Sequence, residues 1–256
     1  PTVTYFELNT SKGIFEDINV RKAMILSIDR DELVEVTDGM IAPAYSLIIE
    51  SMQNYNADAS AYFEKNLANN PEEAKKLLED AGWKDTDGDG IREKDGKKLV
   101  VKWLTYPTRQ ELPLLAEAAQ ASLKEIGIEV DINNTLDVNE VVQDASAWDV
   151  YAMANVQAPT GDPEYWFRVF ALSDSAKNQG KYSNAQLDAL DEQLSQEFDT
   201  AKRADLAVQM QQILLDDNAF VFCSFLKMSM ISRSNVSNYT SHACDYYQIT
   251  ADLDIE

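Results

Sequence analysis

Histidine and cysteine are scarce in this sequence, which removes the side chains on which many catalytic and metal-binding sites depend. The 256 residues include one histidine, His242, and two cysteines, Cys223 and Cys244. A metal site built on histidines is therefore excluded, and the two cysteines lack the close spacing of a structural zinc site. They form either one disulfide bond or two thiols. A hydrolase would have His242 as its only imidazole, and we keep this as a third hypothesis.

Nucleotide-binding and membrane-spanning motifs are also missing. The nine glycines form neither G-x-G-x-x-G nor G-x-x-x-x-G-K-[ST], and no apolar run approaches the length of a membrane span. The acidic residues show no spacing that singles out a catalytic pair. We therefore expect a protein that is not an enzyme. Because the chain begins at Pro1 without a methionine or a signal peptide, we expect it to be processed or part of a longer protein.

Basic residues are few relative to acidic ones. The chain has 44 acidic and 22 basic residues, which gives a formal net charge of −22. Such a surface repels the phosphates of nucleic acids, so we expect no nucleic-acid partner. The hydrophobic share of 45% and the charged share of 26% are typical of a globular protein. No linker rich in serine, glycine or proline divides the chain, and its length fits one main domain.

Apolar periodicity predicts alternating strands and helices. We expect strands over residues 3–9, 98–105, 128–132, 148–155 and 219–226. We expect helices around residues 20–28, 31–37, 70–81, 108–126, 137–147, 187–194 and 206–214. Residues 42–56 show no period and are expected to be irregular. This alternation predicts an α/β protein with a mainly parallel or mixed sheet and helices packed on it.

The acidic segment DTDGDGIREKDGK, residues 85–97, fits two interpretations. Asp85, Asp87 and Asp89 with Gly90 match the start of a calcium-binding loop. The glutamate that such a loop needs at its twelfth position is replaced by Gly96, and a strand follows instead of a helix. A turn stabilised by aspartate side chains and glycines explains the same residues without metal. A calcium-stabilised extracellular adhesion or scaffold module is therefore our second hypothesis.

The loop after the strand over 148–155 contains the most distinctive candidate site. Its sequence, APTGDPEYWF, covers residues 158–167, and open α/β sheets bind ligands at the carboxyl ends of strands. The strand over 98–105 ends nearby in the expected sheet. The alternative is that Asp162 caps the next helix and Trp166 is a core residue. The candidate ligand-binding residues are Tyr106, Arg109, Gln157, Pro159, Thr160, Asp162 and Trp166.

Four segments, in this order, resemble one known family. They are NTSKGIFEDINVRKAMILSIDR (9–30), PEEAKKLLEDAGW (71–83), the acidic loop (85–97) and GDP (161–163). They are similar to the C-terminal half of the extracytoplasmic solute-binding proteins, family 5, that serve peptide and nickel ABC importers. The resemblance implies one lobe of a two-lobed periplasmic-binding-protein-like fold of class II, with a mixed sheet flanked by helices. It implies that residues 16–215 form the second lobe, and that the strand-rich segments 1–15 and 219–256 cross a hinge to a missing first lobe.

The resemblance also implies the function of our first hypothesis. It implies a monomeric solute-binding subunit that captures a peptide, a metal chelate or a similar small solute and delivers it to an ABC transporter permease. We expect no cofactor, and structural calcium in the acidic loop is the alternative that the aspartate spacing leaves open. The resemblance implies an extracytoplasmic location, either periplasmic or lipid-anchored at the cell surface through a missing N-terminus. An aspartate of the peptide-binding members aligns with Pro159, and the histidine of the nickel-binding members has no counterpart near residues 172–174. Neither subclass is therefore indicated.

Overall fold

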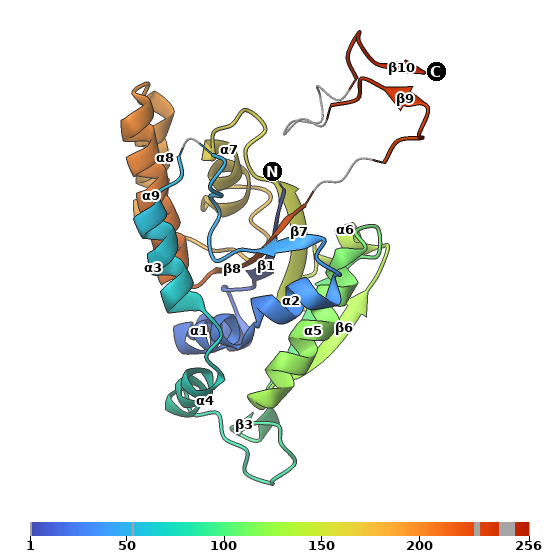
Figure 1. The fold of residues 1–256 in the computed structure, drawn as a ribbon. Helices are drawn as coiled ribbons and strands as arrows, with labels where there is room; N and C mark the ends of the chain where they lie inside the picture. Colours follow the sequence, from blue (N-terminus) through green and yellow to red (C-terminus); the bar gives the residue numbers. More distant parts are fainter. Residues whose placement is uncertain (1, 53, 228–230, 241–248, 256) are drawn as a thin grey trace.

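The central sheet is assembled from segments that lie far apart in the sequence (Figure 1). The computed structural model describes residues 2–52, 54–227, 231–240 and 249–255. The strand order is β2-β8-β1-β7-β5-β6; β5 is parallel to both of its neighbours, and the other pairs are antiparallel. The strands are β1 Thr2–Leu8, β2 Ile41–Pro43, β5 Val100–Thr105, β6 Glu129–Asn134, β7 Val150–Val156 and β8 Phe220–Leu226. This mixed sheet confirms the predicted α/β class.

Helices surround the sheet, and two pairs of two-residue strands lie outside it. A hairpin pairs β3 (Glu93–Lys94) with β4 (Lys97–Lys98), and β9 (Val236–Ser237) pairs with β10 (Asp254–Ile255). The helical segments are the 3-10 helix η1 Gly13–Glu16, α1 Ile18–Ser27, α2 Arg30–Val36, α3 Ala57–Leu67, α4 Pro71–Asp80, α5 Glu111–Glu125, α6 Val138–Val141, α7 Glu164–Trp166, the π-helix η2 Phe167–Ala171, α8 Ala185–Gln196 and α9 Thr200–Asp216.

The predicted β-α-β unit is formed by β5, α5 and β6. The apolar face of α5, which includes Leu112 and Leu123, is buried, as its helical spacing predicts. Gly127 ends the connection from α5 with a φ of 87°. A Cβ at Gly127 would lie 2.7 Å from Cγ of Arg92, so this position requires glycine. The parallel pairing of β5 with β6 confirms the topology expected from the sequence.

The first strand of the chain lies inside the sheet, between two strands from much later in the sequence. β1 pairs with β7 on one side and with β8 on the other. Residues 220–225 of β8 are all buried, which is typical of an internal strand. The sheet therefore does not divide at the predicted lobe boundaries near residues 16 and 215. The assignment of residues 1–15 and 219–256 to a first lobe stays a prediction.

Side chains of β1 distinguish the two faces of the sheet. Successive residues of a strand point to opposite faces. The ring of Phe6 lies 4.6 Å from that of Trp103 on β5, whereas the ring of Tyr5 lies 5.2 Å from that of Trp166 on α7. The Tyr5 face is therefore covered by α7. A layer made by α1, α2, α4 and α5 packs together, and α3, α8 and α9 stand along one side of the molecule (Figure 1).

Arg30 is a buried arginine that joins several elements. Its guanidinium donates hydrogen bonds to the carbonyl oxygens of Ala44 at 2.7 Å, Phe222 at 2.8 Å and Leu67 at 3.1 Å. The ring of Tyr45 lies 4.4 Å from its Cζ. Burial lowers the pKa of Arg30 to about 10. Arg30 thus links α2 to β8, to the end of α3 and to the segment after β2, which gives the family-like segment 9–30 a structural role.

The helix predicted over residues 137–147 is shorter in the structure, so the predicted length was wrong. α6 ends at Val141. Beyond it the indole Nε1 of Trp148 donates a hydrogen bond to the carbonyl oxygen of Val142 at 3.1 Å, and the carboxylate of Asp144 accepts one from the backbone of Ser146. These contacts favour a turn, because a side chain that binds the local backbone competes with helical hydrogen bonds.

The helix α3 was not predicted. Asn56 caps it by accepting a hydrogen bond from the backbone N–H of Ala59 at 2.9 Å. Only Phe63 and Leu67 of α3 are buried. The apolar pattern is therefore too sparse to indicate a helix, although the capping residue is visible in the sequence.

Candidate functional site

One edge of the sheet, which we call the carboxyl edge, collects the ends of several strands. β5 is parallel to β6 and β7, and because β1 is antiparallel to both β7 and β8, β8 also ends at this edge. The loops after β5 and β7, residues 106–110 and 157–163, leave the sheet here, near the end marked N in Figure 1. The structure therefore brings the two loops that hold the sequence-predicted residues to one edge, where α/β sheets bind ligands.

Tyr106 and Arg109 follow β5 at the carboxyl edge. The ring of Tyr106 lies 6.5 Å from that of Tyr151 on β7. Burial raises the pKa of Tyr106, whereas a backbone hydrogen bond with Ala154 and the positive charge of Arg109 lower it. Arg109 is partly exposed, and no ion pair of the described residues includes it. Tyr106 is thus held against β7, and the Arg109 charge remains available beside it.

Three further candidates follow β7. Gln157 is fully buried, and its Nε2 lies 3.0 Å from Sδ of Met52. Its amide oxygen has no hydrogen-bond partner among the described residues. Pro159 and Thr160 are exposed in the loop that follows. Contact of these three residues with a ligand stays a prediction.

Asp162 is engaged in contacts that stabilise the fold. Its carboxylate accepts a hydrogen bond from the backbone N–H of Glu164 at 2.9 Å and pairs with Nε of Arg203 on α9, also at 2.9 Å. Arg203 also pairs with the carboxylate of Glu164 at 2.5 Å and donates to the carbonyl oxygen of Leu194 at 2.6 Å. These contacts raise the pKa of Arg203. Asp162 therefore starts α7 and connects it to α9, which is the structural alternative that the sequence left open.

Trp166 lies in the core. Its side chain is fully buried, and its ring lies 5.2 Å from those of Tyr5 and Phe220 and 5.4 Å from that of Phe222. Such edge-on contacts among aromatic rings are typical of a packed interior. The structure thus supports the core role of Trp166 rather than a place on the surface of the carboxyl edge.

Sequence reasoning missed several buried polar residues near the carboxyl edge. Buried polar groups almost always have hydrogen-bond partners. Nine buried side-chain nitrogen or oxygen atoms of the described residues have none. Four of these belong to residues of β1, β8 and β5 and to the start of α5, namely Thr4, Ser224, Thr105 and Glu111. A fifth belongs to Gln157 after β7, which the sequence analysis had already named as a candidate. Their residue types are ordinary for strands and helix starts, so only the pairing of the strands reveals that they gather here.

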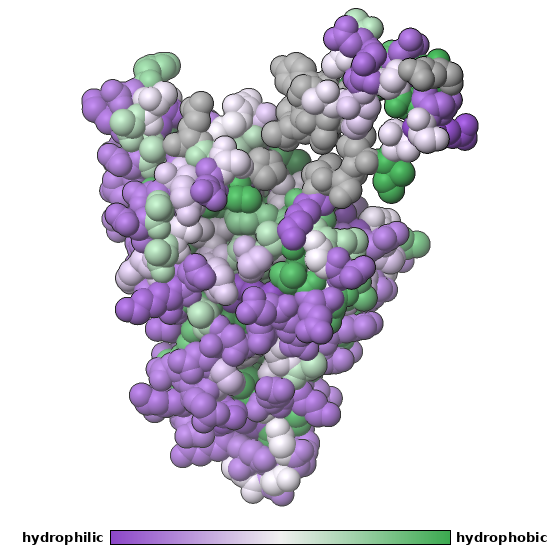
Figure 2. Space-filling view, in the orientation of Figure 1, coloured by the Kyte–Doolittle hydropathy of each residue, from purple (hydrophilic) through white to green (hydrophobic). Residues whose placement is uncertain are grey.

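Apolar side chains border the same region. Val36, Met40 and Leu114 are each about two-fifths exposed, at 41%, 43% and 37%, and Val156 at the end of β7 is 47% exposed. The backbone N–H of Lys227 donates to the carbonyl oxygen of Met40, which places Met40 beside the end of β8. Figure 2 shows apolar residues in the upper half of this face and a mainly hydrophilic lower half. Polar groups at the carboxyl edge are thus accompanied by exposed apolar surface.

The acidic loop lies at the opposite end of the molecule, before β5. The carboxylate of Asp85 accepts hydrogen bonds from the backbone N–H groups of Gly88 at 2.7 Å and Gly90 at 3.0 Å, and Lys98 pairs with Asp89. Carboxylate oxygens of Asp85, Asp87, Asp89 and Glu93 lie within 4.8 Å of one another. The backbone contacts are those of a turn. Calcium binding by Asp85, Asp87 and Asp89 stays a prediction.

A comparison with known families decides the class of this protein. Residues 1–178, more than half of the chain, match the family described as "Bacterial extracellular solute-binding proteins, family 5 Middle". The chain belongs to this family. The resemblance drawn from the sequence segments is therefore confirmed.

Relatives within family 5 cover nearly the whole chain. The oligopeptide-binding protein AppA of Bacillus subtilis is 30% identical over 243 residues, which make up 93% of this chain and 44% of the relative. The nickel-binding protein NikA of Staphylococcus aureus is 28% identical over 222 residues, 86% of this chain and 42% of the relative. This family 5 chain thus spans less than half the length of these relatives.

Solved structures agree with the fold. The structure of AppA from Bacillus subtilis in complex with a nonapeptide has a TM-score of 0.82 at 27% identity, covering 94% of this chain and 48% of AppA. NikA from Staphylococcus aureus in complex with Ni(L-His)2 has a TM-score of 0.81 at 25% identity, covering 100% of this chain and 51% of NikA. These likenesses confirm the predicted fold class.

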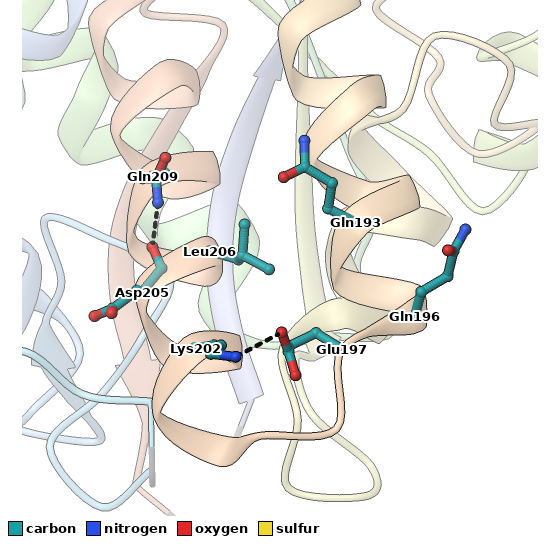
Figure 3. A pocket seen from close by; sticks show the side chains of 7 residues that line it. All are labelled: Gln193, Gln196, Glu197, Lys202, Asp205, Leu206 and Gln209. Atoms are coloured by element: carbon teal, nitrogen blue, oxygen red, sulfur yellow. Dashed lines mark hydrogen bonds and ion pairs between the residues drawn. The ribbon is translucent and has the colours of Figure 1, made fainter.

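Two surface grooves of this family 5 chain are lined by residues other than the sequence-predicted candidates. A groove of about 490 Å³ lies between α8 and α9 (Figure 3). Across it Lys202 of α9 pairs with Glu197 at 3.8 Å, and Gln193 and Gln196 extend from α8. A second groove of about 390 Å³ adjoins the acidic loop. None of the candidate ligand-binding residues lines either groove.

Two predictions involve residues that lie outside the described part of the chain, His242 and Cys244. The hydrolase hypothesis stays a prediction, whereas Cys223, the expected partner of Cys244 in the disulfide alternative, is a free thiol. Cys223 is a buried free cysteine whose thiol donates to the carbonyl oxygen of Thr4 at 3.1 Å. In the described part of the chain, no helix combines the length and apolar character needed to cross a membrane.

Proposed function

We propose that this family 5 chain is part of the solute-binding subunit of an ABC importer and helps to capture a peptide, a metal chelate or a similar small solute. The observation that carries the proposal is its likeness, over nearly the whole chain, to proteins named for binding oligopeptides and nickel. The curated relatives in the comparison are named as binding proteins, which supports a role without catalysis.

The carboxyl edge is the proposed site of capture. The candidate residues follow two neighbouring strands. Tyr106 and Arg109 come after β5, and Gln157, Pro159 and Thr160 come after β7. Exposed apolar surface beside polar groups suits a small organic solute, which needs both burial and orientation. In the proposed mechanism the first lobe closes over the solute at this edge, and the closed form is recognised by a membrane permease.

The location follows from the same proposal. A subunit that captures solutes for import works outside the cytoplasm, either in a periplasm or anchored by lipid at the cell surface. The formal charge of −22 fits this role, because it disfavours non-specific binding to anionic membrane lipids.

Native mass spectrometry of the natural full-length protein, purified from its host under mild conditions, tests the proposal. We expect an added mass that corresponds to a retained peptide or metal chelate and that disappears after partial unfolding and refolding. Protein that carries no added mass, and that gains none after incubation with a pool of random peptides or with nickel and histidine, would contradict the proposed function.

A further inference from the structure

Arg203 is an arginine whose guanidinium group contacts two separate segments of the chain. It lies in the first turn of α9, and its side chain is 17% exposed. Its Nη1 donates to the carbonyl oxygens of Leu194 at 2.6 Å and Glu197 at 2.8 Å, where α8 ends. Its Nε donates to Asp162 at 2.9 Å and its Nη2 to Glu164 at 2.5 Å. One side chain therefore joins the corner between α8 and α9 to the end of the loop after β7.

The loop after β7 is held at both of its ends. Gln157 begins it, buried with its Nε2 at 3.0 Å from Sδ of Met52, and Asp162 near its end pairs with Arg203. The residues between these contacts, 159–161, are exposed and include a glycine with a φ of 86°. Glycine gives a backbone more conformational freedom than any other residue. The conformation of the exposed middle of the loop therefore depends on the contacts at its ends.

The acceptors around Arg203 require a guanidinium group. A guanidinium is planar and holds five N–H donors in a fixed arrangement, whereas the ammonium of lysine has three. Three nitrogens of Arg203 donate to two carboxylates and two carbonyl oxygens. A lysine at this position keeps the positive charge but has fewer donors than there are acceptors. Arg203→Lys therefore separates the geometry of these contacts from their charge.

A second arginine belongs to the same group of ion pairs but lies beyond the loop. Arg168 pairs with Glu164 and with Asp191 of α8, both at 3.1 Å, and its side chain is 51% exposed. Exposed ion pairs contribute little, because water and salt screen them. Asp162, the carboxylate within the loop, pairs with the more deeply buried Arg203. Arg203 is therefore the arginine that fixes the loop.

A loop that is already held before a solute arrives favours binding. Ordering a mobile loop during association opposes binding, and a preorganised loop avoids that loss. Pro159 and Thr160, two of the candidate ligand-binding residues, lie in the stretch that Arg203 holds in place through its neighbour Asp162.

We propose that Arg203 is a positioning residue for solute capture, which acts through Asp162 and Glu164 to hold the loop after β7 in its binding conformation. This inference rests on the proposed function, because it concerns the same site. Arg203 contributes to affinity without contacting the solute.

Affinity measurements on the natural full-length protein test this role. The probes are a pool of random hexapeptides and nickel with histidine, and native mass spectrometry measures the bound fraction. The proteins are the parent, Arg203→Lys, Asp162→Asn and the double variant. We expect each single variant to bind about tenfold more weakly, the effect of ordering one or two more side chains on binding. The double variant should bind no more weakly than the single ones, because both changes break the same contact.

Arg21→Lys is the matched control. Arg21 is a half-buried arginine that donates to three carbonyl oxygens, among them that of Asp217 at the other end of α9. We expect both arginine variants to unfold at a lower temperature, but Arg21→Lys to bind the probes as the parent does. Amide hydrogen exchange within residues 157–166 should be faster in Arg203→Lys and unchanged in Arg21→Lys.

Three results would overturn the role of Arg203 and leave the proposed function standing. Unchanged affinity or unchanged hydrogen exchange in Arg203→Lys would show that the loop does not need the guanidinium. An equal loss of affinity in Arg21→Lys would show a general effect of lower stability. Losses that add in the double variant would show that Asp162 acts independently of Arg203. A parent that binds neither probe contradicts the proposed function itself, and the inference falls with it.

Discussion

Glu7 is a carboxylic acid held almost entirely inside the protein, and its proton makes the stability of the fold depend on pH. It lies on β1 opposite Tyr151 of β7 and is 2% exposed. Its Oε1 accepts a hydrogen bond from the backbone N–H of Gly180 at 2.6 Å. The perturbation is Glu7→Gln, which keeps an oxygen acceptor for Gly180 and replaces the ionisable group with a neutral one.

The size of the effect follows from the pKa. Burial raises the pKa of Glu7 from 4.5 to about 8, and the backbone N–H groups of Gly180 and Gln179 oppose this rise only in part. The folded protein thus keeps a proton that the unfolded chain releases near pH 4.5. The contribution of this proton to the free energy of unfolding is fully present below pH 4.5 and is lost as the pH rises through about 8. At about 1.4 kcal/mol per pKa unit, the loss is about 5 kcal/mol.

Urea unfolding followed by tryptophan fluorescence between pH 4.5 and 9 measures this loss. We expect the free energy of unfolding of Glu7→Gln, relative to that of the parent, to increase by about 5 kcal/mol across this window and to level off above pH 8. The exposed control Glu117→Gln should follow the parent. If the free energy of unfolding of Glu7→Gln relative to the parent changes by less than about 1 kcal/mol between pH 4.5 and 9, the pKa of Glu7 is raised by less than one unit and the prediction is wrong.

Three further predictions concern the fold and the acidic loop. Arg30→Met leaves buried carbonyl oxygens without donors, and we expect it to lower the free energy of unfolding by about 3 kcal/mol or more; an unchanged urea midpoint would contradict this. A Cβ at Gly180 would lie 2.2 Å from the carbonyl oxygen of Leu8, so we expect Gly180→Ala to lower the free energy of unfolding by about 3 kcal/mol. Gly88 has a positive φ but open space around it, so Gly88→Ala should lower it by only about 1 kcal/mol. Equal losses in the two variants would count against the close contact at Gly180. Calcium binding predicts terbium emission sensitised by tryptophan that saturates at one equivalent and is lost in Asp87→Ala, and silence at millimolar terbium would exclude the site.

The sequence was most informative where a single pattern determines local structure. Helical spacing of leucines in α5 and alternation in β6 predicted the β-α-β unit, because burial on one face fixes both patterns. The same reasoning failed for α3, where only Phe63 and Leu67 are buried. It also extended α6 too far, because Asp144 and Trp148 make turn contacts that depend on neighbours in space.

The candidate site was predictable only in part. The sequence placed Tyr106 and Gln157 at the ends of strands, and strand pairing brings those strands together. Residue type did not show that Trp166 would be buried against Tyr5, a partner far away in the sequence. Nothing in the sequence indicated that Oε1 of Glu111 would be buried without a hydrogen-bond partner, since a glutamate in the first turn of a helix is common and its burial depends on the tertiary fold.

The most direct test of the central claim, that this chain is a lobe that captures a solute by closure, is small-angle X-ray scattering of the natural full-length protein. Scattering is recorded alone and with saturating pools of random peptides or metal chelates. The account predicts that at least one pool reduces the radius of gyration, as expected when two lobes close over a solute. Scattering that stays the same with every pool would contradict it.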